Sequence, residues 1–232
     1  MPMDQRCNRI FECLDRSDEH DCRNLRIQEE SYIKDIPPFT DGTSIMINVS
    51  LILMSVDKID LTSATFHAKI ELILKWKDYR LTFANLLQDG NIVGKDMKQE
   101  IWMPPLRFTN APIGSLINDQ ETTISIMKEG NYELNDITEL HGARIYRGSE
   151  NSLKYSRNYE MDFKCSFNLL LYPFDAQTCT INLDIPDFFQ DYIDIYNESI
   201  RNIGSTKLEQ FGSLKLNLLQ LRTTLKSSAR YF

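Results

Sequence analysis

Hydrophobic side chains recur at every second position in four segments of the chain. These segments are residues 45–53, 66–76, 159–171 and 179–185, and polar side chains fill most of the positions between. A period of two is typical of half-buried β-strands, whose successive side chains point to opposite faces. Shorter strands are expected at five further places: residues 101–108, 122–127, 143–147, 192–196 and 214–225. The pattern therefore predicts an all-β protein, an immunoglobulin-like antiparallel β-sandwich of about ten strands.

The first 36 residues do not share this pattern. Residues 1–22 are polar and acidic, and residues 23–36 place a few apolar side chains among charges. Such a segment can form a short helix, which Pro37 and Pro38 would end. We therefore expect a short N-terminal helix before the first strand.

Composition and charge exclude several classes of protein. The chain has 232 residues, of which 42% are hydrophobic and 25% charged, so it is neither disordered nor collagen-like. Its formal net charge of −7 argues against a nucleic-acid partner, because such proteins need a basic surface. No apolar stretch approaches the ~20 residues that cross a bilayer. No leader opens the chain, so we expect any signal peptide to have been removed or to lie outside it.

The five cysteines form two groups. Cys7, Cys13 and Cys22 lie near the start, and Cys165 and Cys179 lie far along the chain. The first group sits in a polar segment with little to bury it, which favours an oxidising compartment over a cytosolic protein with scattered buried thiols. Zinc is a weaker alternative, because there is no Cys-x-x-Cys pair and no histidine at a usual ligand spacing. An odd number leaves one cysteine without a partner in this chain.

Catalytic motifs are absent from the sequence. The chain has only three histidines, of which His67 lies on the polar side of a strand and His141 precedes a turn glycine. There is no Gly-x-Ser-x-Gly elbow, P-loop or dinucleotide-binding glycine motif. We therefore expect that the protein is not an enzyme and that it requires no cofactor.

The segment from Cys165 to Cys179 carries the most information. Thirteen residues separate the two cysteines, and the turn between them is Tyr172-Pro173-Phe174-Asp175. A disulfide closing such a loop would contribute roughly 3 kcal/mol. Exposed rings on a stiff loop suggest docking against another apolar element. The segment resembles the Cys-loop of the pentameric neurotransmitter-gated ion channels, in which thirteen residues with an aromatic-Pro-x-Asp core separate two cysteines.

Other motifs agree with this resemblance in order and spacing. The Trp76-x-Asp78-x-x-Leu81 motif and the Trp102-x-Pro104 segment followed by Asn110 are similar to motifs of the same family. Val56-Asp57-Lys58 resembles the family's turn after the first strand, which faces the membrane domain. The resemblance covers residues 23–232, and Tyr231-Phe232 falls where the family's first membrane helix begins.

The resemblance implies the extracellular ligand-binding domain of a channel at the plasma membrane. It implies a ring of five identical or related subunits, a small ligand between subunits, and a transmembrane domain outside this chain. It also implies a Cys165–Cys179 disulfide that links neighbouring strands. Six residues would contact the membrane domain during gating: Asp57, Lys58, Tyr172, Pro173, Phe174 and Asp175.

The implied ligand site departs from the family's pattern. Thr109 stands where the family has Tyr, Pro186 stands where it has Trp or Phe, and Glu71 stands where it has an aromatic residue. The third loop, near residues 213–220, has no ring and no vicinal cysteine pair. Ile73 stands where glycine and GABA sites usually have Arg. The implied site comprises Thr109, Pro186, Phe188, Phe189, Glu71, Ile73, Lys154, Tyr155 and Ser156.

These departures predict that the site is not a standard acetylcholine site. An ammonium ligand needs the faces of several aromatic rings. None remains at the matched positions, and Phe188, Phe189 and Tyr155 could supply rings only from shifted places.

The N-terminal cysteines resemble the second half of a low-density-lipoprotein-receptor class A module. The shared pattern is Cys-x5-Cys-x-Asp-x-Ser-Asp-Glu-x-x-Cys, which in the full module holds one calcium ion through oxygen ligands. The resemblance implies a Cys7–Cys22 disulfide, a segment of residues 1–22 separate from the domain of residues 23–232, and Cys13 without its partner. The implied calcium ligands are Asn8, the Ile10 carbonyl, Glu12, Asp18 and Glu19, although Asn8 and Glu12 stand where the family has Asp.

Two alternatives to a channel domain stay open. A soluble ligand-binding protein of the same fold, like the acetylcholine-binding proteins, would keep the sandwich without a pore, and a secreted adhesion sandwich would lack the Cys-loop motif. The apolar Tyr172 and Phe174 favour the channel, because a soluble protein gains from polar loop tips. Asn48-Val-Ser50 and Asn197-Glu-Ser199 are glycosylation sequons if a eukaryote secretes the chain.

Overall fold

The computed structural model describes residues 10–19, 22–27, 32–39, 43–112, 122–134, 144–170, 178–202 and 215–221, with the backbone alone for 134, 178, 197–202 and 215–221. Strands dominate these residues and helices are few. The strands are β1 (Leu25–Ile27), β2 (Ile45–Asp60), β3 (Thr65–Trp76), β4 (Leu81–Ala84), β5 (Asn91–Ile92), β6 (Arg107–Phe108), β7 (Thr123–Met127), β8 (Glu133–Leu134), β9 (Arg144–Arg147), β10 (Ser152–Lys164), β11 (Thr178–Asp184), β12 (Ile193–Asn202) and β13 (Lys215–Leu221). The helical elements are η2 (Ser17–Glu19), α1 (Lys95–Lys98) and η3 (Asp187–Phe189).

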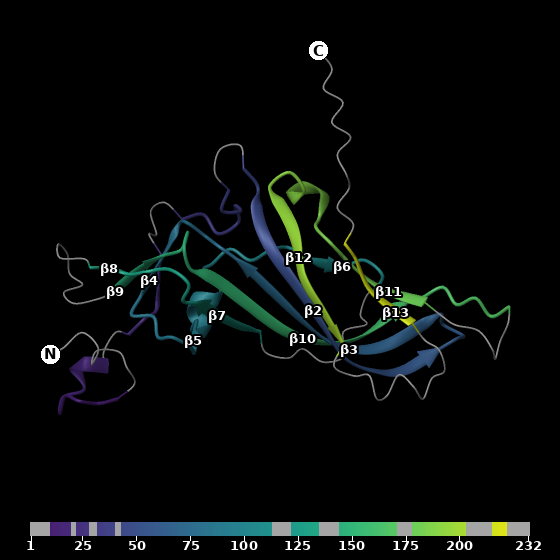
Figure 1. The fold of residues 1–232 in the computed structure, drawn as a ribbon, viewed down its shortest axis with the longest axis horizontal. Coiled ribbons are helices and arrows are strands. Elements are labelled where there is room, and N and C mark those ends of the chain that lie inside the picture. Colours follow the sequence, from purple (N-terminus) through teal and green to yellow (C-terminus); the bar gives the residue numbers. More distant parts are fainter. Residues whose placement is uncertain are drawn as a thin grey trace, which may run out of the picture. The chain divides into compact units, whose positions relative to one another are not determined.

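The strands form three sheets. The largest has the order β12-β2-β3-β10-β7-β5, and Figure 1 shows its long members β2, β3 and β10 side by side. The others have the orders β1-β4-β9-β8 and β13-β11-β6. Neighbouring strands pair antiparallel in the registers that the structure gives, except that β13 pairs parallel with β11. The prediction of an all-β, immunoglobulin-like sandwich is confirmed.

The alternating pattern of β3 translates directly into burial. Every second side chain of this strand is almost fully buried, and those between are half-buried. The buried set is Phe66, Ala68, Ile70, Leu72, Leu74 and Trp76. Removing such side chains from water contributes about 1.5–3 kcal/mol for each large one, which explains why this strand forms where the sequence predicts it.

The short helix expected in residues 23–36 is not found in the described part of that segment. Residues 25–27 instead form β1, which pairs with β4 so that Leu25 lies opposite Phe83 and Ile27 opposite Leu81. Leu25 is buried at 3% exposure. Local propensity was therefore overridden, because a strand lets Leu25 enter the core while its backbone completes a sheet edge.

The chain divides into two compact units, each assembled from separate segments. The first combines Met1–Ile47, Leu74–Met103 and Thr122–Ser156, and the second combines Asn48–Ile73, Pro104–Glu121 and Arg157–Phe232. In the second unit Phe66 stacks on Phe163 at 5.5 Å between ring centroids, and Phe108 meets Phe163 edge to face at 5.6 Å.

A buried polar network lies in the core of the first unit. Asp78 is fully buried and receives a hydrogen bond of 2.8 Å from Nη2 of Arg80, which also donates from Nη1 to the carbonyl oxygens of Ile33 and Ile36. The Tyr32 hydroxyl donates to Asp78 at 3.2 Å and accepts from the Trp102 backbone at 2.7 Å. Burial raises the pKa of Tyr32 to about 12, so this hydroxyl stays protonated well into the alkaline range.

The turn after β9 explains one glycine of the sequence. A Cβ at Gly148 would lie 2.0 Å from the carbonyl oxygen of Asp78 and 2.7 Å from that of Leu81. The backbone N–H of Gly148 donates to this Leu81 oxygen at 2.9 Å. Only glycine allows the turn to approach the Trp76-x-Asp78-x-x-Leu81 segment this closely.

Candidate functional site

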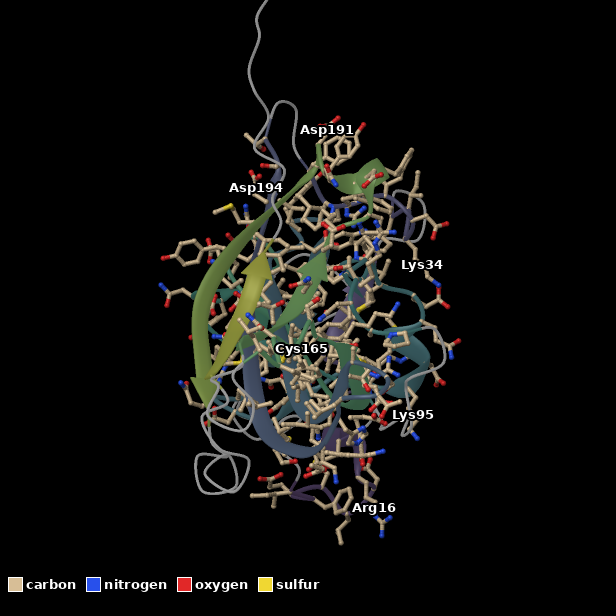
Figure 2. All side chains as sticks on the ribbon, turned by 90° about the vertical axis from the view of Figure 1, so that its right-hand side faces the viewer. Arg16, Lys34, Lys95, Cys165, Asp191 and Asp194 are labelled. Carbon is tan, nitrogen blue, oxygen red and sulfur yellow. A yellow bond between two sulfur atoms is a disulfide. The ribbon has the colours of Figure 1, made fainter. Side chains whose placement is uncertain are left out.

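The disulfide predicted between Cys165 and Cys179 is present in the second unit. The two Cα atoms are 5.3 Å apart, and both cysteines are buried; Figure 2 labels Cys165. The two strands that the disulfide links, β10 and β11, are neighbours along the chain but are not paired in one sheet. Cys165 directly follows β10, whereas Cys179 lies in β11, and these strands belong to different sheets. The bond therefore joins two sheets. A disulfide requires only that its two cysteines lie close together, so the strands that carry them need not be paired.

Asn110 reinforces the same junction. Its Nδ2 donates to the carbonyl oxygens of Lys164 (3.1 Å) and Thr180 (2.7 Å), and its Oδ1 accepts from the Asn182 backbone at 2.9 Å. Its own carbonyl oxygen accepts from the Lys164 backbone at 2.8 Å. One side chain thus ties the end of β10 to β11 beside the disulfide.

The β2–β3 turn contacts the first cysteine of the disulfide. Asp60 accepts hydrogen bonds from the backbones of Thr62 (2.9 Å) and Ser63 (3.2 Å). These bonds lower the pKa of Asp60 below its usual value, and the bond from Ser63 has the larger effect. Ala64 closes the turn at a positive φ of 53°, and its carbonyl oxygen accepts from the Cys165 backbone at 2.9 Å. The turn and the first cysteine of the loop are therefore directly coupled.

Asp57 and Lys58 do not form this turn, contrary to the interpretation of Val56-Asp57-Lys58 as a turn. Strand β2 continues to Asp60, so both residues lie within the strand, where both are exposed. Asp57 pairs with Lys69 at 3.4 Å, and Lys58 pairs with Asp60 at 3.5 Å. Residues 172–175, the other proposed gating contacts, lie outside the described residues.

Strand pairing brings two of the proposed ligand loops together in the second unit. Phe108 of β6 lies opposite Leu183 of β11, and the backbone N–H of the exposed Thr109 donates to the Asn182 carbonyl at 2.9 Å. Pro186 and η3 follow directly after β11 along the chain. Of the expected positions, Thr109 and Pro186 therefore belong to adjoining strand ends.

Two rings occupy the loop after Pro186. Phe188 is 80% exposed, and its ring meets that of the half-buried Phe189 edge to face at 5.2 Å. Arg107 lies beside this loop, 3.4 Å from Asp184 and 4.0 Å from Asp187. The loop thus presents one open aromatic face with a cation and carboxylates close by, which is a surface suited to a small charged or amphiphilic ligand.

The residues proposed for the opposite face of the subunit interface lie on two long strands. Glu71 and Ile73 are half-buried on β3 and alternate with buried neighbours. Lys154 and Ser156 are half-buried on β10, where they lie opposite Ser125 and Thr123 of β7. Tyr155, between them, is only 7% exposed. Its ring points to the opposite face from Lys154 and Ser156, because side chains alternate along a strand.

The N-terminal segment contains an unsatisfied acidic group. Asp18 is 1% exposed; its Oδ2 accepts from the Glu12 backbone at 2.7 Å, and its Oδ1 has no hydrogen-bond partner among the described residues. Burial acts to raise the pKa of Asp18, but hydrogen bonds from the backbone, including that of Glu12, outweigh it and lower the pKa. Glu19 is half-buried, the Glu12 side chain is exposed, and Asn8 lies outside the described residues. A buried carboxylate oxygen without a donor fits a cation.

Two further expectations involve residues that are only partly described. Cys22 is disulfide-bonded, as a Cys7–Cys22 pair requires, whereas Cys7 lies outside the described residues. Asn48 is half-buried on β2 between the buried Ile47 and Val49, on the side of the strand away from the core. The side chain of Asn197, the other sequon, lies outside the description.

One cluster of charged side chains on the second unit was not predicted from the sequence. It comprises Asp57, His67, Lys69, Glu160 and Asp162, from β2, β3 and β10. The available signal was a histidine and a lysine two positions apart on one strand, with two acids equally spaced on another. The pairing of those strands, which brings the charges together, could not be read from the sequence.

Comparison with known proteins gives consistent matches. A family model described as the neurotransmitter-gated ion-channel ligand binding domain matches residues 23–225. The gamma-aminobutyric acid receptor subunit rho-2 of Bos taurus is 23% identical over 191 residues, and the rho-1 subunit of Homo sapiens is 24% identical over 196. A gamma-aminobutyric acid receptor subunit beta-like protein of Drosophila melanogaster is 22% identical over 187.

These matches cover most of this chain but a minor part of each relative. They span 81%, 81% and 75% of this chain and 37%, 36% and 34% of the relatives, respectively. Among the residues that the structure describes, no helix has the length and apolar character needed to cross a membrane. The chain therefore spans about a third of the length of the curated relatives it matches.

Proposed function

The chain belongs to the neurotransmitter-gated ion-channel ligand-binding domain family, and from this premise we propose that it is the extracellular, non-catalytic domain of a pentameric channel. In this proposal it binds a small ligand between subunits and couples binding to a pore formed by another part of the protein. The observation that carries the proposal is the Cys165–Cys179 bond beside the β2–β3 turn, within the matched residues. Ligand-driven movement of the sheets would reach the disulfide loop and the turn together.

The chemistry of the site argues for a ligand other than acetylcholine, glycine or GABA. A ring holds an ammonium group with about 0.5–2 kcal/mol, and Phe188 is the one open ring among the described residues of the proposed site. Binding through one or two rings stays near the millimolar range. Glu71 is half-buried, and by pairing with a cation it would add about 1 kcal/mol. We therefore propose a small cation or amphiphile as the ligand.

A chimera tests this proposal. The chain is joined to the membrane part of a neurotransmitter-gated channel, and currents are recorded across a panel of transmitters, amines and amphiphiles. We expect current from a cationic or amphiphilic compound and none from acetylcholine, glycine or GABA below about millimolar concentration. Phe188→Ala should weaken the active compound about two- to thirtyfold, whereas Tyr192→Ala, which removes another exposed ring, should not.

The other outcomes separate the alternatives. Micromolar GABA or acetylcholine responses would contradict the ligand assignment, and GABA is the sharper test because the relatives are named as its receptors. Chimeras that reach the cell surface as pentamers but give no current with any compound would contradict the coupling. Calorimetric binding to the isolated chain in that case would indicate a soluble ligand-binding protein of the same fold.

We propose calcium binding as a second function, located in residues 1–22. The orphaned Oδ1 of the buried Asp18 supports it, and Glu19, Glu12 and the Ile10 carbonyl would complete a set of hard oxygen ligands with Asn8. Extracellular modules of this kind bind calcium at about 0.1–1 mM. In this reading the ion supplies charge compensation and order to the segment, and no step of ligand recognition depends on it.

A calcium titration checks this second proposal. Calcium at millimolar concentration should raise the thermal stability of the N-terminal segment, followed by the NMR signals of residues 10–22. Asp18→Asn should abolish the effect, because it removes the buried negative charge. Asp15→Asn is the matched control, since Asp15 is exposed and its contacts with Ser17 need only an acceptor oxygen. Equal responses of the two variants would refute the assignment.

A further inference from the structure

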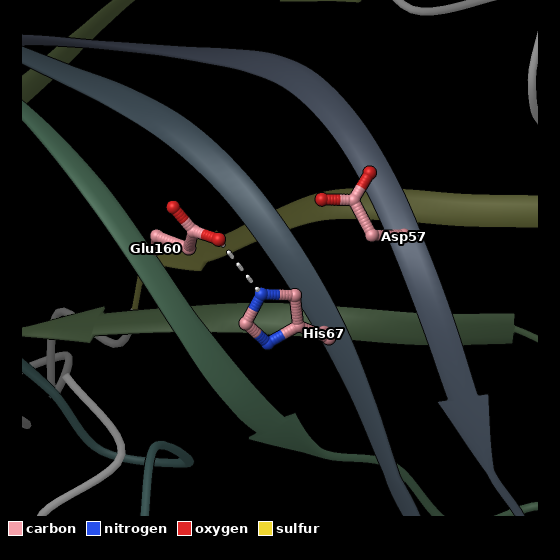
Figure 3. Close-up of side chains that lie close together, drawn as sticks. All are labelled: Asp57, His67 and Glu160. Carbon is pink, nitrogen blue, oxygen red and sulfur yellow. Dashed lines mark ion pairs between the residues drawn. The ribbon is translucent and has the colours of Figure 1, made fainter. Parts of the chain in front are cut away.

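Three acceptor groups face one another on the second unit. Asp57 of β2, His67 of β3 and Glu160 of β10 each place a ligand atom within 4.8 Å of the other two. Figure 3 shows the Glu160 carboxylate facing the His67 ring, with the Asp57 carboxylate on the neighbouring strand. The distance from His67 Nε2 to Glu160 Oε1 is 3.5 Å. The side chains of His67 and Glu160 are only 13% and 26% exposed, so water screens them incompletely.

A fourth residue fixes the orientation of the imidazole. His67 Nδ1 lies 2.9 Å from Oδ1 of Asp162, and an ionised carboxylate can only accept, so Nδ1 carries the proton. In the neutral ring the lone pair is then on Nε2, which is the atom that faces Glu160. A carboxylate that holds one ring nitrogen while the other faces the metal is the usual arrangement around zinc-bound histidine.

The arrangement of these groups could hold a cation. A lone pair and two carboxylates that face one another repel unless a positive charge lies between them. Lys69 supplies part of it, because its Nζ lies 3.4 Å from both Asp57 Oδ2 and Glu160 Oε1. The contacts of Lys69 are with the two carboxylates and not with Nε2 of His67, which faces Glu160. A metal ion could bind this nitrogen and both carboxylates together.

We propose that Asp57, His67 and Glu160 form a binding site for a zinc ion, with Asp162 as the positioning residue and Lys69 as a competing internal cation. One imidazole and two carboxylates suit zinc, which in open sites takes three protein ligands and keeps a position for water. Calcium and magnesium are disfavoured, because they prefer oxygen ligands throughout. The inference concerns a single chain and is independent of the proposed ligand and pore.

Zinc titration of the full chain tests the site, with calorimetry and thermal unfolding as readouts. All samples carry Cys13→Ser, because thiolates bind zinc strongly and would obscure a weaker site. We expect one zinc ion per chain and a higher unfolding temperature, because the ion ties three strands together. His67→Gln should abolish both effects, and the matched variants His20→Gln and His141→Gln should abolish neither.

Two further variants identify the roles of the neighbours. Lys69→Met should tighten zinc binding about tenfold, because the competing ammonium is removed, whereas Lys75→Met on the same strand should leave it unchanged. Asp162→Ala should weaken binding about 10–100-fold through loss of the ring orientation. Circular dichroism checks that each variant is folded. Absence of stoichiometric binding in both the parent chain and Lys69→Met, or binding that survives His67→Gln, would overturn the proposal.

Discussion

Replacing Arg80 with methionine should destabilise the protein by about 3–5 kcal/mol. The Asp78 carboxylate is fully buried, and Arg80 contributes two of the hydrogen bonds to it, from Nε at 2.9 Å and Nη2 at 2.8 Å. The methionine keeps most of the volume but leaves a buried charge without its counter-ion, which is among the most costly single changes in a folded protein. Chemical denaturation monitored by tryptophan fluorescence measures the loss, because Trp76 and Trp102 lie in the same unit.

Two companion variants show whether burial is the cause. Arg147→Met removes an exposed pair with Glu133, whose side chains are 63% and 61% exposed, and should cost no more than about 1 kcal/mol. Combining Arg80→Met with Asp78→Leu removes both charges and should recover part of the loss, since an apolar pair can replace a buried ion pair. Equal effects of Arg80→Met and Arg147→Met would contradict the interpretation of the network.

Replacing Cys165 and Cys179 together with alanine should cost about 3 kcal/mol. The bond closes a loop with a sequence separation of 14, for which the loss of unfolded-chain entropy predicts this value. In a chain of this size the loss lowers the unfolding temperature by about 6–12 °C. Differential scanning calorimetry measures the change, with Cys13→Ala as the control that removes a cysteine outside this loop.

The disulfide should also matter for coupling within the second unit. The Cys165 backbone donates to Ala64 of the β2–β3 turn, and Asn110 ties the end of β10 to β11. In the chimera, the double alanine variant should therefore lose ligand-evoked current more than it loses ligand binding. A variant that unfolds near the temperature of the parent chain would contradict the stability estimate, and one with unchanged current would contradict the coupling.

The short strands and the N-terminal segment show why sequence patterns have a limited reach. Strands β4, β5 and β8 have two to four residues, too few for a period of two to be visible. The segment containing Leu25 has helix-compatible spacing, but pairing with Phe83 across a sheet decides its conformation. Elements that depend on a distant partner carry little local signal.

The candidate site likewise combines residues that spacing predicted correctly with residues that it placed wrongly. Residue spacing identified the disulfide partners Cys165 and Cys179, because a motif of this kind depends on order along the chain. The ligand positions that it suggests on β3, β10 and η3 stay a prediction. It placed Tyr155 among the available rings, whereas the alternation of β10 buries this residue. It also placed Asp57 in a turn, whereas β2 continues through it.

The faces of the long strands, the family and the disulfide could be read from the residues alone, because alternation and cysteine spacing are local properties of the chain. The identity of neighbouring strands emerges only in the folded chain. That arrangement places the disulfide between two sheets and gathers Asp57, His67 and Glu160 from three strands into one cluster. Strand order and register depend on contacts between residues far apart in sequence, so no single segment encodes them.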